Sequence, residues 1–282
     1  WCVTDIYDYR ASKERLYRVH LEAIRQRADF VKKSIKTSRG YVDINLYYPA
    51  KEQLSYPVCF NFHGGGFVLG LMEQDDAYCR YLADRAGILV VNIDYPLAPE
   101  YPFPEPIDIS SQVIMAVLEQ ADDLKIDSSQ VFLSGSSAGG NLALACQHYL
   151  WQERQLDITG LIINYATFDL GQWFSQSRYR DWYLTKREDA LNPLASPLKS
   201  KVKVEAKTLL VLAGQDPLYQ EGLDYAKHLL KLGSTVEVAI YDSAHHGFLH
   251  DMYQEYDKSL ADEAKEKIIS FLQEQTKKVK IY

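Results

Sequence analysis

Short apolar segments separated by helical segments are the feature that most restricts the fold of this chain. Six segments are apolar at nearly every position: residues 58–62, 88–93, 131–133, 161–163, 209–212 and 236–240. Unbroken apolarity is typical of strands that are covered on both faces of a sheet. Helical periodicity is found over residues 75–85, 107–120, 138–151, 221–232 and 258–275. This alternation predicts an α/β fold, with a mainly parallel sheet between layers of helices.

Two parts of the chain depart from this alternation. Near the N-terminus, residues 12–28 predict an amphipathic surface helix. One face of that helix would contain Leu16, His20, Ala23, Ile24 and Arg27. Residues 31–37 and 41–48 flank Gly40 and predict a β-hairpin with one buried face. Farther along, residues 170–203 mix aromatic and charged side chains with Asn-Pro and Ser-Pro pairs, so we interpret them as an insertion rather than part of the sheet.

Composition and charge exclude several classes of protein. With 282 residues, 47% of them apolar and 24% charged, the chain fits one domain with insertions rather than a disordered or coiled-coil protein. Its net charge of −7 provides no positive field that would hold nucleic acid or an anionic membrane. The apolar segments fall far short of the about 20 residues that cross a bilayer. The first residues do not have the pattern of a signal peptide. We therefore expect a cytoplasmic protein with neither nucleic acid nor a membrane as a partner.

The four cysteines have neither the spacing of a zinc site nor that of a disulfide framework. They are Cys2, Cys59, Cys79 and Cys146. We expect reduced thiols, and we expect neither a metal nor a cofactor.

The strongest catalytic signal is the sequence GSSAG at residues 135–139. It lies between an expected strand and an expected helix, the context in which a GxSxG sequence displays a nucleophilic serine. The backbone of such a serine is strained, and small neighbours such as Gly135 and Gly139 let strand and helix pass closely. A turn of small residues that only opens a helix would give the same pattern, so the motif alone leaves both interpretations open.

A second motif, HGGGF, occupies residues 63–67 directly after an expected strand. Successive glycines leave backbone N–H groups free to point into a crevice, and fixed donors of this kind stabilise the oxyanion of acyl transfer by about 3 kcal/mol each. We expect Gly64, Gly65 and Ala138 to supply these N–H groups, and His63 to shape the loop rather than transfer a proton. The alternative is a phosphate-binding loop, but the sequence contains neither GxxxxGK[ST] nor GxGxxG here.

With these motifs in order, the chain resembles the hormone-sensitive lipase-like esterases of the α/β-hydrolase fold. The matching segments are HGGGF at 63–67, DYPLAPE at 94–100, SAGGN at 137–141, DPL at 216–218 with EG at 221–222, and HGF at 246–248. The resemblance implies one α/β-hydrolase domain over residues 1–282, built on a mostly parallel eight-stranded sheet flanked by helices. A helical cap would be formed by residues 1–30 and 170–203. Ser137 would be the nucleophile, Asp216 the acid and His246 the general base of a catalytic triad.

The positions of the three triad residues agree with these roles. Each follows the C-terminal end of an expected strand, where open α/β sheets gather their sites, and the chain order Ser, Asp, His is that of the fold. The alternatives are His245 for the base, and Asp169, Asp224 and Asp242 for the acid. We favour His246 because Gly-Phe follows it, as in the family.

Two departures from the family pattern leave the subfamily, and with it the substrate size, open. Pro96 stands where the family usually has arginine, and Ser136 stands where aspartate or threonine is common. Neither residue takes part in the triad chemistry.

The implied function is that of a serine carboxylesterase acting on small, short-chain acyl esters. We expect Phe67, Trp182 and Phe248 to bind the substrate. Some of the aromatic residues of the insertion are expected to line its pocket: Trp173, Phe174, Trp182 and Tyr183. A small-molecule ester is the expected partner, and a homo-oligomer is left open.

Two other functions remain alternatives at this point. An amidase or formamidase would use the same triad. A catalytically silent ligand-binding protein of the same fold would have lost the triad histidine, and the presence of His246 argues against it.

Overall fold

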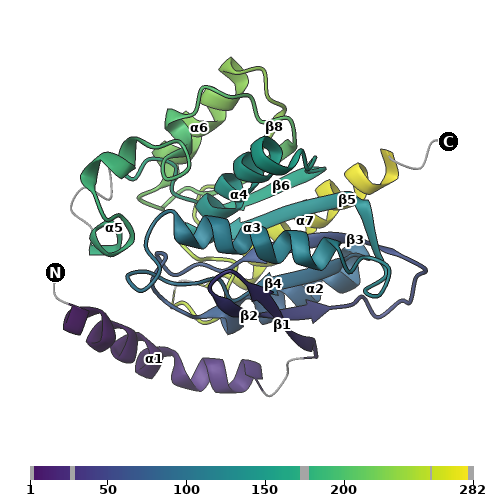
Figure 1. Cartoon of the computed structure of the whole chain (residues 1–282), viewed down its shortest axis with the longest axis horizontal. Coiled ribbons are helices and arrows are strands. Elements are labelled where there is room, and N and C mark those ends of the chain that lie inside the picture. Colours follow the sequence, from purple (N-terminus) through teal and green to yellow (C-terminus); the bar gives the residue numbers. More distant parts are fainter. Residues whose placement is uncertain (1–2, 26–28, 172–177, 255, 279–282) are drawn as a thin grey trace.

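One eight-stranded sheet organises the described part of the chain (Figure 1), which in this computed structural model comprises residues 3–25, 29–171, 178–254 and 256–278. Its strands lie in the order β1-β2-β4-β3-β5-β6-β7-β8. They are β1 (Val31–Thr37), β2 (Gly40–Tyr47), β3 (Tyr56–Phe62), β4 (Leu89–Ile93), β5 (Ile126–Ser136), β6 (Gly160–Asn164), β7 (Lys207–Ala213) and β8 (Val236–Tyr241). β2 is antiparallel to β1 and β4, and the other pairs are parallel. The predicted fold class, including the hairpin, is confirmed.

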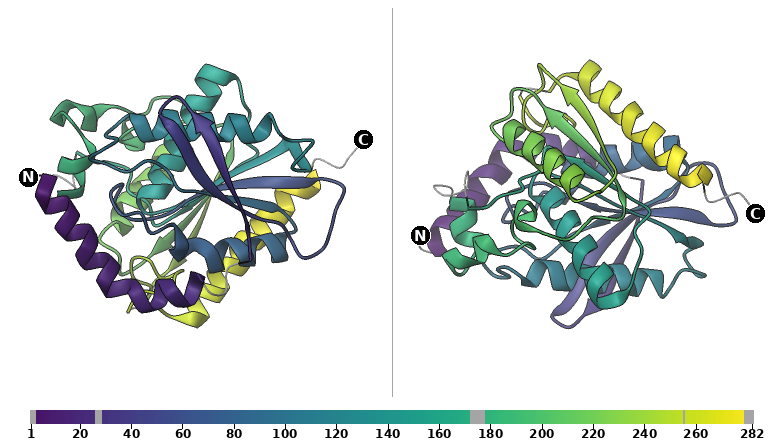
Figure 2. Two further views of the ribbon diagram at one scale, coloured as in Figure 1. Left: turned by 60° about the horizontal axis from the view of Figure 1, so that its bottom comes forward. Right: turned by 90° about the horizontal axis from the view of Figure 1, so that it is seen from above.

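The helices occur close to where helical periodicity predicted them. The α-helices are α1 (Val3–Arg25), α2 (Asp76–Ala86), α3 (Glu105–Leu118), α4 (Ala138–Arg154), α5 (Arg178–Tyr183), α6 (Tyr219–Lys231) and α7 (Lys258–Lys278). Short 3-10 helices are η1 (Met72–Asp75), η3 (Arg187–Leu191) and η4 (Pro197–Lys199). Figure 2 shows the helices stacked on both sides of the sheet.

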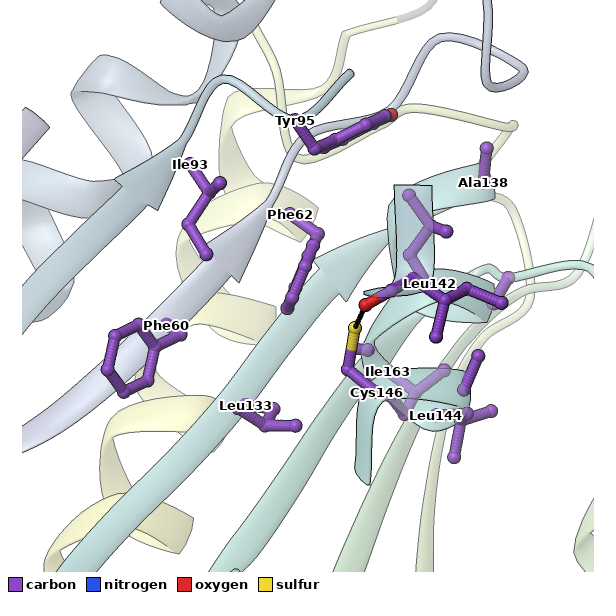
Figure 3. Packing of buried hydrophobic residues seen from close by; sticks show 14 of the residues in the cluster. Phe60, Phe62, Ile93, Tyr95, Leu133, Ala138, Leu142, Leu144, Cys146 and Ile163 are labelled. Carbon is purple, nitrogen blue, oxygen red and sulfur yellow. Dashed lines mark hydrogen bonds between the residues drawn. The ribbon is translucent and has the colours of Figure 1, made fainter. Parts of the chain in front are cut away.

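Alternate residues of each central strand pack against different helices. Phe60 and Phe62 of β3 belong to the core that contains α3, α4 and α6, whereas Cys59, the residue before Phe60, belongs to the core that contains α2 and α7. Figure 3 shows the first of these cores, where Leu133 of β5 lies below Leu142 of α4. Because side chains alternate along a strand, a strand covered on both faces must be apolar throughout. This explains the unbroken apolar segments of the sequence.

The N-terminal helix α1 is longer than predicted, and it buries a different face. Leu16 and Val19 are 64% and 76% exposed, whereas Ile6 and Leu21 are buried. The predicted face was wrong because polar groups fix the helix: the Arg10 guanidinium donates to the carbonyl oxygens of Val68 and Ala98, each at 2.7 Å. Apolar periodicity cannot reveal such an anchor. Ala23 is exposed, and the side chain of Ile24 and the whole of Arg27 lie outside the described residues.

The predicted insertion lies between β6 and β7, where its described residues form α5, η3 and η4 and add no strand to the sheet. This insertion lies beside the N-terminal helix α1, although the two are far apart in the sequence, as both views in Figure 2 show. There the hydroxyl groups of Tyr9 and Tyr179 are hydrogen-bonded, and the Tyr9 ring packs 5.5 Å from Trp182. Among the described residues, no helix is both long and apolar enough to span a membrane.

Candidate active site

Ser137 lies at a sharp turn between β5 and α4. Its backbone has φ 56° and ψ −121°, a conformation that residues other than glycine rarely adopt. The turn brings α4 so close to β3 that a Cβ atom on Gly139 would lie 2.0 Å from the carbonyl oxygen of Phe62. A Cβ atom on Gly135 would lie 2.3 Å from the carbonyl oxygen of Gly139. Both glycines are therefore required by backbone packing, and this packing holds the serine in its strained conformation.

Ser137, His246 and Asp216 are connected by two successive hydrogen bonds. His246 Nε2 lies 3.0 Å from Ser137 Oγ, and His246 Nδ1 lies 2.6 Å from Asp216 Oδ2. The Asp216 side chain is buried, and its other oxygen accepts the Leu218 N–H at 2.8 Å. The imidazole is 39% exposed, so a substrate and water can reach it. Because a carboxylate only accepts hydrogen bonds, Asp216 holds the proton on Nδ1 and leaves Nε2 to accept from the serine.

The alternative acids and base lie elsewhere. Asp169 is buried but pairs with the Lys199 ammonium at 2.7 Å. His245, Asp224 and Asp242 are exposed. Of the histidines and carboxylates that the sequence analysis considered for the triad, the structure therefore connects only His246 and Asp216 to Ser137 by hydrogen bonds.

The glycine loop lies beside the serine. A Cβ atom on Gly64 would be 3.7 Å from Ser137 Cβ, and Gly64 and Gly65 both line the cavity next to it. Their N–H groups have no hydrogen-bond acceptor within the ranges that the structure describes. Ala138 is the first residue of α4, so its N–H lacks an intrahelical acceptor as well. Three backbone N–H groups close to Ser137 in the structure are thus without an acceptor among the described residues.

A cavity of about 320 Å³ contains these groups. Its walls come from the core and from α1 and α5: Lys13, Tyr17, Gly64, Gly65, Gly66, Leu69, Leu71, Gln74, Ser136, Ser137, Tyr165, Tyr179, Asp216, Pro217, Leu218, His246, Gly247, His250 and Tyr253. The carboxyl end of the sheet therefore supplies the reactive groups, and the two distant helices close the space above them.

The residues predicted to bind the substrate do not line this cavity, and that prediction is corrected. Phe67 is buried, with its ring stacked on Tyr183 at 3.9 Å. Trp182 is buried against Tyr9, and Phe248 packs 5.7 Å from Tyr165. All three are core-packing residues, because large aromatic rings gain most from full burial.

Two further aromatic residues of the predicted pocket, Trp173 and Phe174, lie outside the described residues.

Sequence reasoning missed the side chains that do form the walls. Lys13 and Tyr17 follow the half-buried face of α1, between Ile6 and Leu21. Recognising that face would have found them, since residues spaced by three and four lie together on a helix. Gln74 and Tyr253 belong to no motif, and no sequence signal identified them.

A buried polar pair lies against one wall of the cavity. His250 Nε2 is 3.4 Å from Asp75 Oδ1, and both side chains are almost fully buried. Burial raises the pKa of Asp75 to about 8 and lowers the pKa of His250 to about 3. Both groups are therefore neutral near pH 7, since removal from water penalises the charged form of each. They add no net charge beside the serine.

Metal coordination has no evident site among the residues that the structure describes, where no three His, Cys, Asp or Glu side chains gather in a suitable cluster. The described cysteines, Cys59, Cys79 and Cys146, are buried free thiols. Burial raises the pKa of Cys146 to about 12, which makes it a poor nucleophile.

Comparisons with known proteins agree with this arrangement. A family model described as alpha/beta hydrolase fold matches residues 59–250. The chain is 30% identical to the ethyl acetate hydrolase of Pseudomonas putida over 254 residues, which cover 80% of this chain and 78% of that protein. It is 31% identical to an arylesterase of Saccharolobus solfataricus over 217 residues, which cover 71% and 70% of the two chains.

Solved structures of esterases are similar over nearly the whole chain. A thermostable carboxylesterase from a metagenomic library has a TM-score of 0.86 at 26% identity, covering 96% of this chain and 97% of that one. A hyperthermophilic esterase from Pyrobaculum calidifontis has a TM-score of 0.86 at 25% identity, covering 96% and 94%.

Proposed function

The chain belongs to the hormone-sensitive lipase-like esterases of the α/β-hydrolase fold and is a carboxylic ester hydrolase, and from this premise we propose that it cleaves small, short-chain acyl esters with Ser137, His246 and Asp216 as its catalytic triad. The observation that carries the proposal is the unbroken hydrogen bonding from Ser137 Oγ to His246 and from His246 to Asp216. Nucleophile, base and orienting acid are within reach of one another before any substrate binds.

In the proposed mechanism, Ser137 Oγ attacks the ester carbonyl carbon while His246 Nε2 takes the hydroxyl proton. Asp216 holds the imidazole in position and stabilises its cation. The tetrahedral intermediate then collapses, the carbon–oxygen bond to the alcohol breaks, and His246 returns the proton to the leaving oxygen. A water molecule repeats the cycle on the acyl-enzyme and releases the acid.

The N–H groups of Gly64, Gly65 and Ala138 are the proposed oxyanion donors. Negative charge develops on the carbonyl oxygen only as the serine attacks, so donors fixed in advance stabilise the transition state more than the substrate. Their position beside Ser137 and their lack of other acceptors support this role.

A preference for short acyl chains is supported by the size of the site. Its volume of about 320 Å³ lies near the lower end of the range for ligand pockets, about 300–1,000 Å³. The similar protein from Pseudomonas putida is named for ethyl acetate, a short-chain ester. We also propose that α1 and the described part of residues 170–203 act as a cap, because Lys13, Tyr17 and Tyr179 close the cavity above the triad.

Replacement of the nucleophile tests the triad. Ser137→Ala should fold with an unchanged circular dichroism spectrum and lose ester hydrolysis by at least about 10⁴-fold, because no other group can form the acyl-enzyme. Ser129→Ala is the matched control, since Ser129 lies at the opposite end of β5 and is exposed. A Ser137→Ala protein that hydrolyses esters at the wild-type rate would refute the assignment.

A panel of p-nitrophenyl esters from acetate to decanoate tests the chain-length preference. The value of kcat/KM should peak at the shorter esters and decline with longer chains, whereas a maximum at decanoate would contradict the proposal. A matched p-nitroanilide series should react far more slowly. Faster turnover of the amides would favour the amidase alternative, which uses the same triad.

A further inference from the structure

The carbonyl oxygen of Gly64 accepts hydrogen bonds from two buried side chains. His63 Nδ1 lies 2.7 Å from it, and Gln74 Nε2 lies 3.0 Å from it. Burial lowers the pKa of His63, so the ring is neutral, and because a carbonyl oxygen can only accept, Nδ1 carries the hydrogen and donates it. Two donors from different parts of the chain, the end of β3 and η1, thus fix the direction of one peptide group.

Fixing this carbonyl also fixes the next N–H group. The peptide bond between Gly64 and Gly65 is trans, so the Gly65 N–H points opposite to the Gly64 carbonyl. The carbonyl is directed into the protein, at His63 and Gln74, and the N–H is therefore directed away from them. Gly65 lines the cavity that contains Ser137. A rotation of this peptide would turn the N–H away from the proposed oxyanion position.

Gln74 is itself oriented by Tyr253. The Tyr253 hydroxyl donates to Gln74 Oε1 at 3.0 Å, which leaves the amide nitrogen to face Gly64. The rings of Tyr253 and Tyr17, the latter on α1, pack in a T-shaped arrangement with their centres 5.8 Å apart. The Tyr253 ring also packs against Gly247, the residue after His246: a Cβ atom on Gly247 would lie only 2.8 Å from a carbon of that ring. One side chain thus joins the cap helix, the histidine loop and the glycine loop.

We propose that Gln74 is a positioning residue of the oxyanion hole: its amide, oriented by Tyr253, holds the Gly64–Gly65 peptide so that the Gly65 N–H points at the developing oxyanion. The proposal rests on the proposed function, since it assumes that Gly65 is an oxyanion donor. Gln74 does not touch the reacting atoms and acts through the backbone. Gln74 is 3% exposed, and both polar ends of its amide are engaged, which a residue that merely fills space would not need.

Gln74→Met keeps the length of the side chain and removes both polar ends. Loss of a whole oxyanion donor lowers kcat by about 10²–10³-fold, and because His63 still holds the carbonyl, we expect a fall of about tenfold. The Michaelis constant should not change, since the substrate carbonyl is uncharged. Affinity for a trifluoromethyl ketone, which forms an oxyanion adduct with the serine, should fall by the same factor as kcat/KM.

Gln74→Glu provides a readout that a structural role would not produce. A protonated carboxyl can donate to Gly64 and accept from Tyr253, as the amide does, whereas a carboxylate cannot donate. The variant-to-wild-type ratio of kcat/KM should therefore be near one at the acidic end of the active range and fall as the introduced carboxyl ionises. The titratable groups that share this cavity cancel in the ratio: Lys13, Tyr17, Tyr165, Tyr179, Asp216, His246, His250 and Tyr253. The buried neighbours His63 and Asp75 cancel likewise.

Gln53→Met is the matched control, because Gln53 Nε2 donates to the carbonyl of another glycine, Gly87, at 2.8 Å and does not line the cavity. It should retain the wild-type rate. Tyr253→Phe should lower kcat less than Gln74→Met, and it should have no further effect when added to that variant. This cycle also covers the case in which Gln74→Met folds poorly, since Tyr253→Phe alone must then show the loss in kcat.

Two results would overturn the proposal: a folded Gln74→Met enzyme with wild-type kcat and inhibitor affinity, or a loss that falls on KM alone. If Ser137→Ala is inactive while Gln74→Met is unaffected, only the role of Gln74 fails. If Ser137→Ala keeps the wild-type rate, the proposed function fails first.

Discussion

The two sides of the cavity are built in different ways. On the core side, Ser137 is held by backbone atoms in contact with other backbone atoms, such as Gly139 against Phe62. On the cap side, Lys13, Tyr17 and Tyr179 reach the cavity from α1 and α5, which meet through side chains at Tyr9. From this difference we propose that the core side supplies the chemistry, whereas the cap side selects which ester fits. Changes to the core should affect folding and kcat, and changes to the cap should affect KM and chain length.

Adding one methyl group within the core packing, and another where the glycine loop faces Tyr179 on the cap side, is the strongest test of this contrast. Gly139→Ala would place its Cβ 2.0 Å from the Phe62 carbonyl oxygen, and neither backbone can yield. We expect a loss of more than about 4 kcal/mol in the free energy of unfolding, or no folded protein. Gly66→Ala would place its Cβ 2.5 Å from the Tyr179 ring, a side chain that can move. Because Gly66 has φ 62°, we expect a cost of only about 1–2 kcal/mol.

Thermal and urea unfolding of the two variants measure this difference. Similar stabilities for Gly139→Ala and Gly66→Ala would show that the core side is as adaptable as the cap side. The Gly66→Ala enzyme should also change its chain-length profile, because Tyr179 must shift.

The next largest effect is expected in the pH dependence of the free energy of unfolding, through Asp75 on the core side. Burial raises the pKa of Asp75 from 3.8 to about 8, so between these values the folded chain keeps a proton that the unfolded chain has released. The free energy of unfolding therefore falls as pH rises, by at most about 1.4 kcal/mol per pH unit. Asp75→Asn should remove this slope between about pH 7 and 8, a window in which unfolded His250 is already mostly neutral.

Urea unfolding across that pH window checks the slope. Asp224→Asn is the control, since Asp224 is exposed, and it should keep the wild-type slope. If Asp75→Asn and the wild type lose stability in parallel as pH rises, Asp75 is already ionised in the folded protein.

The smallest effect is expected on the cap side. Tyr179→Ala removes a ring from the cavity wall and its hydrogen bond to Tyr9. We expect the ratio of kcat/KM for hexanoate over acetate to rise about tenfold, because a wider pocket admits added methylene groups. The value of kcat for acetate should stay within about threefold of wild type, since no triad contact is lost. Tyr41→Ala, at a 73% exposed position on the hairpin, should leave the profile unchanged.

The core side was also the part that the sequence could predict. Gly135 and Gly139 are demanded by backbone contacts that every strand-turn-helix of this kind makes, so their spacing marked Ser137. The order of strands and helices followed from unbroken apolar segments and helical apolar patterns, and the sheet and the esterase activity are confirmed.

The cap side could not be predicted in the same way. Arg10 anchors α1 to backbone carbonyls that lie more than fifty residues away, so local periodicity selected the wrong helical face. Phe67, Trp182 and Phe248 were expected at the substrate, but aromatic residues are as well suited to a core as to a pocket. Gln74 and Tyr253 become meaningful only when the fold brings them together, since 179 positions separate them.

The pairing of Tyr9 with Tyr179 also bears on how the protein is made. These partners are 170 positions apart. At about 5–20 residues per second on the ribosome, α1 emerges roughly 10–30 s before the residue that it binds. Throughout that interval Ile6 and Leu21, which end up buried, have no finished surface to cover them. The cavity that contains Ser137 therefore gains its walls from α1 and α5 only after Tyr179 has left the ribosome.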